Sequence, residues 1–166
     1  YRGTDNQSIL AKPDAGASDI WSGWTMGAGY AGASQAVWAE KFYKEVTGQS
    51  IYADSAPSNV LLTGHSLGGG LAGYIAALSR TSALVFDSMP FGGATALAWL
   101  SHNAEAAAQA LIDALKGNSS AAFAAMPSVA DIRQIYTGGE ILEVVRNATG
   151  NGIFTALSGV LSGARS

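Results

Sequence analysis

One serine of this chain stands in a sequence pattern that suits nucleophilic chemistry. Ser66 is the central residue of Gly64-His65-Ser66-Leu67-Gly68, with a glycine two positions before it and another two positions after it. A serine hydroxyl is a weak nucleophile unless the backbone holds it exposed, beside a base and beside groups that stabilise an oxyanion. A sharp turn from a strand into a helix does this, and its flanking residues must be small where strand and helix nearly touch. The pattern therefore predicts a nucleophilic serine at position 66.

The segments on either side of this pattern favour the same interpretation. A short apolar run, Val60 to Leu62, precedes it, and a segment rich in small residues, Gly68 to Ser79, follows it and predicts a tightly packed helix. Five residues matching Gly-x-Ser-x-Gly also arise by chance in a chain with 21 glycines, so the strand and helix context carries the prediction. At the start of that helix the Leu67 N–H is the expected first donor to an oxyanion.

The chain contains two histidines, His65 and His102, and we expect neither to take the proton from Ser66. Side chains of adjacent residues on such a turn diverge, so His65 is expected to have a structural or packing role. His102 lies inside an alanine-rich helical stretch and is expected to be a surface or capping histidine. The general base is therefore expected outside these residues, in a longer polypeptide or a separately cleaved segment, and the isolated chain is expected to be poorly active.

Length and composition indicate one globular domain. The chain has 166 residues, of which 48% are hydrophobic and 13% charged, and its net charge is −3. The acidic balance argues against a nucleic-acid partner, which would require clustered Lys and Arg. The absence of cysteine excludes disulfides and thiolate metal sites, and no motif implies a metal or an organic cofactor. The two uncharged runs, Ile20 to Ala39 and Ser55 to Ser79, are too rich in glycine and polar residues to predict membrane spans.

Short apolar strands alternate with helices along the chain, which predicts a mostly parallel sheet with helices on both faces. Such a sheet carries its functional site at the carboxyl ends of the strands. The expected strands are 60–62, 82–89 and 131–137, and the expected helices are 31–46, 68–79, 94–116 and 140–147, before a last apolar segment at 153–161.

A loop rich in aromatic residues lies ahead of the first expected helix. It includes Trp21 and Trp24 among several glycines. Exposed aromatic side chains in a polar loop suit a mobile cover that contacts lipid or substrate. The alternative is that they pack into the core, and their sequence alone leaves both interpretations open.

Two short segments, one at the start of the chain and one around Ser66, together resemble a known family. Tyr1-Arg2-Gly3-Thr4, and T-G-H-S-L-G-G-G-L-A from Thr63 to Ala72, are similar to class 3 lipases of the α/β-hydrolase fold and, more loosely, to bacterial lipase-like domains of large secreted proteins. The match covers about the first 95 residues. It implies an incomplete α/β-hydrolase domain, truncated or processed from a longer chain, and suggests a secreted or exported protein. It also assigns Thr4 as the second oxyanion donor and places a lid at about residues 7–26, which favours the mobile cover.

The resemblance also implies the acid of a catalytic triad. In such hydrolases the order along the chain is serine, acid, histidine, and the family places the acid after the strand that here corresponds to 132–136. Glu140 is the candidate at that position. Asp87, at the end of the preceding expected strand, is the alternative acid.

The expected activity is hydrolysis of a lipid or small acyl ester through Ser66, with possible acyl transfer to another acceptor at the same site. Trp21 and Trp24 are expected to contact the lipid interface, and the remainder of a longer polypeptide is an expected partner. The alternative is a degenerate hydrolase domain that serves as a non-catalytic binding or structural module.

Overall fold

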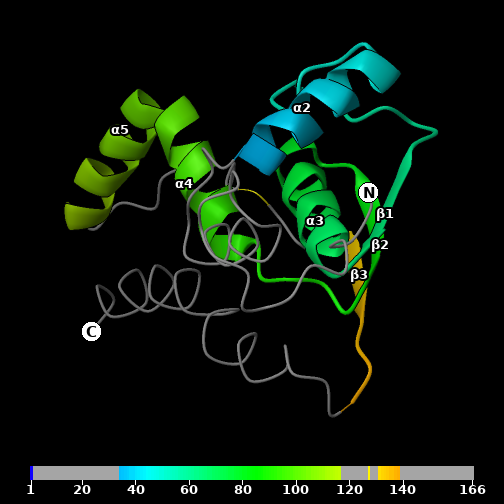
Figure 1. Ribbon diagram of the computed structural model, residues 1–166. Coiled ribbons are helices and arrows are strands. Elements are labelled where there is room, and N and C mark those ends of the chain that lie inside the picture. Colours follow the sequence, from blue (N-terminus) through cyan, green and yellow to red (C-terminus); the bar gives the residue numbers. More distant parts are fainter. Residues whose placement is uncertain (2–33, 117–126, 128–130, 139–166) are drawn as a thin grey trace.

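The computed structural model describes residues 1, 34–116, 127 and 131–138, which form an α/β arrangement with a small parallel sheet (Figure 1). The strands are β1 (Leu61–His65), β2 (Ser82–Phe86) and β3 (Ile132–Ile135), in the order β1-β2-β3. Both pairs are parallel. The carboxyl ends of all three strands therefore meet at one edge of the sheet, as expected.

The strand ends differ from those expected. β1 begins at Leu61 and continues through Gly64 to His65, so it leads directly into the serine. β2 ends at Phe86, three residues earlier than expected, because Asp87 has a φ of 42°. Such a left-handed backbone conformation cannot continue a strand.

The helices are α2 (Ser34–Thr47), α3 (Leu67–Ser79), α4 (Gly92–His102) and α5 (Ala104–Leu115). The single helix expected over 94–116 is wrong, because Asn103 separates α4 from α5 with φ −113° and ψ 37°. Its side-chain Nδ2 donates to the carbonyl oxygen of Trp99 at 2.9 Å. A side chain that hydrogen-bonds to nearby backbone in this way competes with helix continuation.

α3 is the central element of the described fold, because all of its residues are buried. It contacts the sheet on one side, and α2 and α4 pack against it, while α5 follows against α4 (Figure 1). Its glycines allow close approach: a Cβ built on Gly73 would lie 2.4 Å from the Phe91 ring. Tyr74 and Ile75 of α3 and Val85 of β2 are completely buried at the centre of the core.

One face of the sheet is covered and the other is open among the described residues. Leu62 and Val85 point to the covered side, whereas Leu61 is 62% exposed and Ile135 is 46% exposed. All of the described helices lie on the same side of the sheet (Figure 1). Helices on both faces were expected, and in the described part of the chain they occupy one face.

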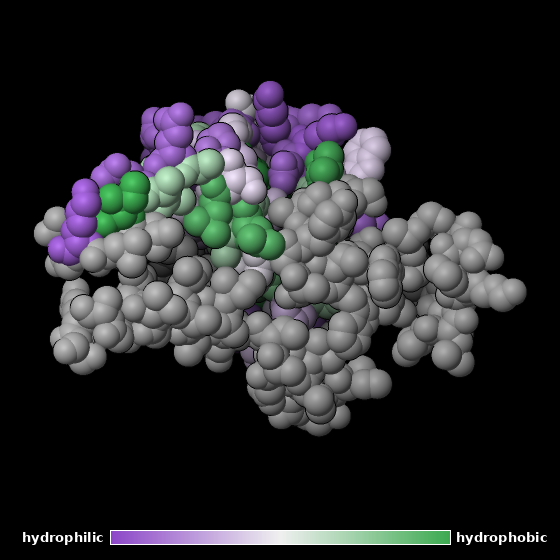
Figure 2. All heavy atoms as spheres, turned by 90° about the vertical axis from the view of Figure 1, so that its left-hand side faces the viewer, coloured by the Kyte–Doolittle hydropathy of each residue, from purple (hydrophilic) through white to green (hydrophobic). Residues whose placement is uncertain are grey.

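The outer helices carry both polar and apolar side chains at the surface. On the side formed by α4 and α5, polar groups lie along the upper part and apolar groups gather below them (Figure 2). Leu97 and Ile112 are exposed on these helices, and α2 exposes Trp38 and Phe42. None of the helices in the described part of the chain combines the length and the apolar composition that a membrane span requires.

Candidate functional site

Ser66 occupies the sharp turn that its sequence predicts. It lies between the last residue of β1 and the first residue of α3, with φ 55° and ψ −123°. A non-glycine residue with positive φ is uncommon and costs on the order of 1–3 kcal/mol, so the surrounding structure must hold it. The serine is half-buried at the carboxyl edge of the sheet, where parallel α/β sheets bind their ligands.

Gly64 permits this turn because strand and helix nearly touch at this point. A Cβ built on Gly64 would lie 2.2 Å from the carbonyl oxygen of Gly68. No side chain can occupy that space without moving the backbone. The sequence requirement for a small residue two positions before the serine therefore has a direct structural cause.

Three backbone hydrogen bonds fix Ser66. Its N–H donates to the carbonyl oxygen of Phe86 at 3.0 Å, and its own carbonyl oxygen accepts from Met89 N–H at 3.0 Å and from Gly70 N–H at 3.0 Å. The bond from Gly70 closes the first turn of α3. The other two bonds join the serine to the last residue of β2 and to the segment that follows it.

Leu67, predicted as an oxyanion donor, lies at the start of α3. It is the first residue of α3, so its N–H has no carbonyl partner within that helix. The N–H groups and the dipole of a helix N-terminus favour negative charge beside them. Its side chain is buried in the core, which anchors the backbone that carries this N–H.

Asp87 also lies at the carboxyl edge, directly after β2. Its Oδ1 accepts from Thr137 N–H at 2.5 Å, and its Oδ2 accepts from the Thr137 hydroxyl at 3.0 Å. Its Oδ2 is also 3.8 Å from Nε2 of His65. The alternative acid is thus placed among the ends of all three strands, beside the residue that precedes the serine.

Of the structural and packing roles expected for His65, its exposure argues against packing. Its side chain is 66% exposed, on the open face of the sheet, and its contact with the carboxylate of Asp87 is compatible with a structural role. Sequence reasoning also missed Thr137, because a threonine at the end of a strand is an ordinary β residue. Only the parallel pairing of β2 with β3 brings it to Asp87.

Several predicted site residues lie outside the described residues: Thr4, Glu140, Trp21, Trp24 and the lid segment 7–26. Tyr1 is described, and it lies beside β1. Its amino nitrogen donates to the carbonyl oxygen of Thr63 at 2.6 Å, and its hydroxyl donates to the carbonyl oxygen of Ala39 at 3.2 Å.

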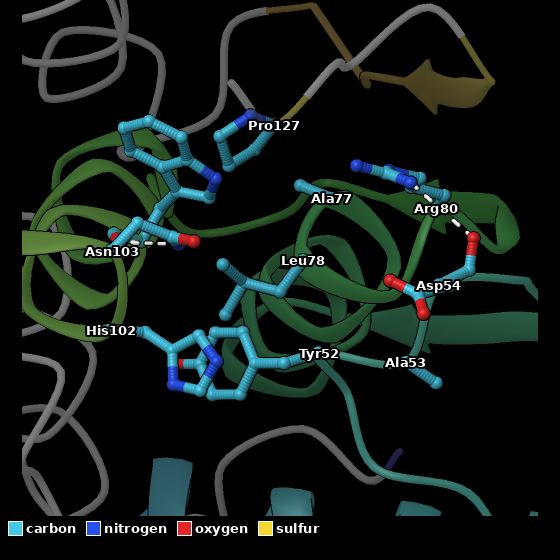
Figure 3. A pocket seen from close by; sticks show the side chains of 10 residues that line it. Tyr52, Ala53, Asp54, Ala77, Leu78, Arg80, His102, Asn103 and Pro127 are labelled. Carbon is cyan, nitrogen blue, oxygen red and sulfur yellow. Dashed lines mark hydrogen bonds between the residues drawn. The ribbon is translucent and has the colours of Figure 1, made fainter. Parts of the chain in front are cut away.

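His102 lies far from the serine, at a separate pocket of about 220 Å³ near the C-terminal ends of α3 and α4. Its ring stacks on Tyr52 with centroids 3.8 Å apart, and Arg80 and Asp54 lie across the pocket (Figure 3). Ser66 is at the opposite end of α3, which is about 20 Å long. His102 is a surface histidine, as expected.

The described residues include no group of three or more His, Cys, Asp or Glu side chains that could hold a metal ion. No family model, curated protein or solved structure matches the chain.

Proposed function

We propose that this chain carries the nucleophile of a serine ester hydrolase of the α/β-hydrolase type, similar to class 3 lipases. The observation that supports this most strongly is the backbone of Ser66. A strained serine at the carboxyl end of a parallel strand and at the start of a helix, held by the end of β2 and the segment after it, matches the requirements of an exposed nucleophile.

In the proposed reaction, the Ser66 hydroxyl attacks the carbonyl carbon of an acyl ester and loses its proton to a base. The Leu67 N–H stabilises the oxyanion, and the base returns the proton to the leaving alcohol. Water, which loses a proton to the same base, then attacks the acyl-serine, and release of the acid restores the Ser66 hydroxyl. No metal or cofactor takes part in these steps.

Thr4 is the proposed second oxyanion donor. It follows Tyr1 by three residues, and three residues span at most about 11 Å. Because Tyr1 hydrogen-bonds to Thr63 of β1, the length of the chain between Tyr1 and Thr4 is compatible with a contact between Thr4 and the Ser66 turn. The lid at 7–26 and a lipid contact through Trp21 and Trp24 remain part of the proposal.

Glu140 is the proposed acid, and it would orient a histidine supplied from outside these 166 residues. His102 is at the other end of α3, stacked on Tyr52, and His65 lies beside Asp87 on the open face of the sheet. The base is therefore proposed to come from further polypeptide, so that the isolated chain has little activity.

Because neither His65 nor His102 is proposed as the base, a second candidate function is a non-catalytic module. Such a module would use the hydrolase surface to bind a lipid, a glycan or a protein. Acyl transfer to an acceptor other than water would use the same serine as hydrolysis.

The test is Ser66→Ala in the longest natural polypeptide that contains these residues. We expect loss of 4-nitrophenyl butyrate hydrolysis by at least about 1,000-fold and loss of labelling by a fluorophosphonate probe. Ser82→Ala is the matched control, because Ser82 is exposed at the opposite end of the sheet, and it should retain full activity.

The isolated chain provides a complementary measurement. If only the base is missing, added imidazole should raise hydrolysis by the wild-type chain above that of the Ser66→Ala chain under the same conditions. Hydrolysis by the natural polypeptide that is unchanged in Ser66→Ala would disprove the proposal. A folded natural polypeptide that neither hydrolyses esters nor reacts with the probe would favour the binding module.

A further inference from the structure

Asp87 has a left-handed backbone conformation, and its contacts with residues at the end of β3 hold it there. Its φ of 42° is in the left-handed region although it is not a glycine, which costs free energy that the surroundings must offset. Its N–H donates to the carbonyl oxygen of Ile135 at 2.8 Å. This bond extends the pairing of β2 with β3 by one residue, and the left-handed φ of Asp87 then ends the strand.

The carboxylate of Asp87 binds the first part of the segment that follows β3. Both of its oxygens accept from Thr137, one from the N–H at 2.5 Å and the other from the hydroxyl at 3.0 Å. Hydrogen bonds to an ionised acceptor are stronger than neutral ones, and this side chain is only 15% exposed. Because the Asp87 carboxylate binds both the N–H and the hydroxyl of Thr137, it defines the position and the direction of the chain at Thr137.

The same short segment that contains Asp87 also holds the nucleophile. Phe86 accepts from Ser66 N–H, and Met89 donates to the carbonyl oxygen of Ser66, each at 3.0 Å. Residues 86–89 thus contact the Ser66 turn through the backbone and Thr137 through a side chain. A displacement of Thr137 relative to Ser66 must break one of these bonds.

We propose that Asp87 is a positioning residue, which fixes the segment after β3 relative to the Ser66 turn. This inference rests on the proposed function, in which Glu140 is the acid and follows Thr137 by three residues. Misplacement of a catalytic group by about 1 Å can cost about 100-fold in rate. Asp87 therefore acts on catalysis through Thr137, and the acid function belongs to Glu140.

The experiment compares Asp87→Asn, Thr137→Val and Thr137→Ser in the natural polypeptide, with steady-state ester kinetics and thermal melting of each variant. We expect Asp87→Asn to lower kcat by about 10- to 100-fold with little change in KM, because a neutral amide binds Thr137 less tightly than a carboxylate, so that the acid is misplaced while substrate binding is retained. Thr137→Val should lower kcat by a smaller factor, and Thr137→Ser, which keeps the hydroxyl, should restore it.

Two further variants distinguish positioning from the acid role. Asp87→Asn combined with Thr137→Val should be no slower than Asp87→Asn alone, because the hydroxyl bond that Thr137→Val removes is one of the two bonds that Asp87→Asn weakens. In a Glu140→Gln background Asp87→Asn should add little. Asp131→Asn, an exposed aspartate directly before β3, is the matched control and should leave kcat unchanged.

Amide hydrogen exchange on the 166-residue chain tests the contact itself without any activity. We expect the Thr137 amide to be protected and to exchange at least about 10-fold faster in Asp87→Asn. An unprotected Thr137 amide in the wild-type chain would overturn the proposed contact, whatever the outcome for Ser66→Ala.

The kinetic outcomes separate the remaining cases. A protected Thr137 amide with unchanged kcat in Asp87→Asn would overturn the positioning role while the proposed function stands. A loss in Asp87→Asn as large as that in Ser66→Ala, with normal Thr137→Val kinetics, would assign the acid to Asp87 instead. Activity that persists in Ser66→Ala would remove the proposed function and, with it, the catalytic role of Asp87.

Discussion

The turn between β1 and α3 depends on two residues, Ser66 and Gly64. The positive φ of Ser66 is held by backbone bonds to Phe86 and Met89, so its strain is offset by structure that lies about 20 residues away in the sequence. Gly64 contributes by lacking a side chain, since a Cβ there would overlap the Gly68 carbonyl. The hydroxyl of Ser66 is presented at the sheet edge because both conditions are met together.

The first prediction concerns Gly64. Gly64→Ala should lower the free energy of unfolding by about 3 kcal/mol or more, because the new Cβ lies 2.2 Å from a backbone oxygen and overpacking against backbone cannot relax cheaply. Gly138→Ala is the control, since nothing lies within 4 Å of its Cβ, and it should change stability by less than about 1 kcal/mol. Urea unfolding measures both, and equal losses would contradict the close approach of β1 and α3.

At the scale of elements, α2 is joined to α3 by polar contacts through a largely apolar interface. The hydroxyl of Tyr74 in α3 donates to Glu40 of α2 at 2.7 Å. Tyr43 of α2 and Thr81, just after α3, share a buried hydrogen bond of 3.1 Å between their hydroxyls. These contacts fix α2 along α3, because a displacement of either helix would leave buried hydroxyl groups without partners.

The second prediction concerns alkaline pH. Burial, and then the hydrogen bond to Glu40, raises the pKa of Tyr74 far above its usual value, and burial, followed by the nearby Tyr43, raises the pKa of Tyr1 to about 12. A pKa raised in the folded state gives stability that is complete below the unfolded value near 10 and is lost as pH rises above it. The chain should therefore become less stable from pH 10 upward.

Tyr74→Phe checks this assignment. The variant should lose about 1 kcal/mol at pH 8 with the hydrogen bond to Glu40, and its stability should fall less steeply between pH 10 and pH 11 than that of the wild type. Urea unfolding at these pH values provides the measurement. An identical slope in the two proteins would show that Tyr74 does not contribute to the alkaline loss.

At the scale of the whole molecule, the described residues form two layers, a sheet and the helices on one of its faces (Figure 1). The covered face contains Leu62 and Val85, and the open face contains Leu61 and Ile135. Parallel sheets are normally covered on both faces. The open face is therefore where the two-layer arrangement differs most from a complete doubly covered sheet.

Adjacent leucines of β1 test which face is covered. Leu62→Ala should lower the free energy of unfolding by about 2–4 kcal/mol, because Leu62 is 9% exposed and its loss leaves a cavity. Leu61→Ala should cost less than about 1 kcal/mol, because Leu61 is 62% exposed. Losses of equal size, measured by urea unfolding of the 166-residue chain, would mean that the second face is also covered in solution.

Local sequence was sufficient to predict the elements around Ser66. The glycine pattern, the apolar run before it and the small residues after it indicate a strand, a turn and a helix, and all three are present. These features depend on residues within a few positions of one another, through backbone hydrogen bonding and steric limits on φ. The same local reasoning missed the break at Asn103, because its polar side chain competes with an otherwise strong helical pattern.

Only the tertiary structure decided which distant residues meet at the sheet edge. Asp87 and Thr137 are 50 positions apart, and they touch because β2 and β3 pair in parallel with Phe86 opposite Ile135. Register and the choice of covered face depend on packing between whole elements, which no local period specifies. The sequence by itself therefore determined the turn at Ser66, while the pairing of strands determined the groups that surround it.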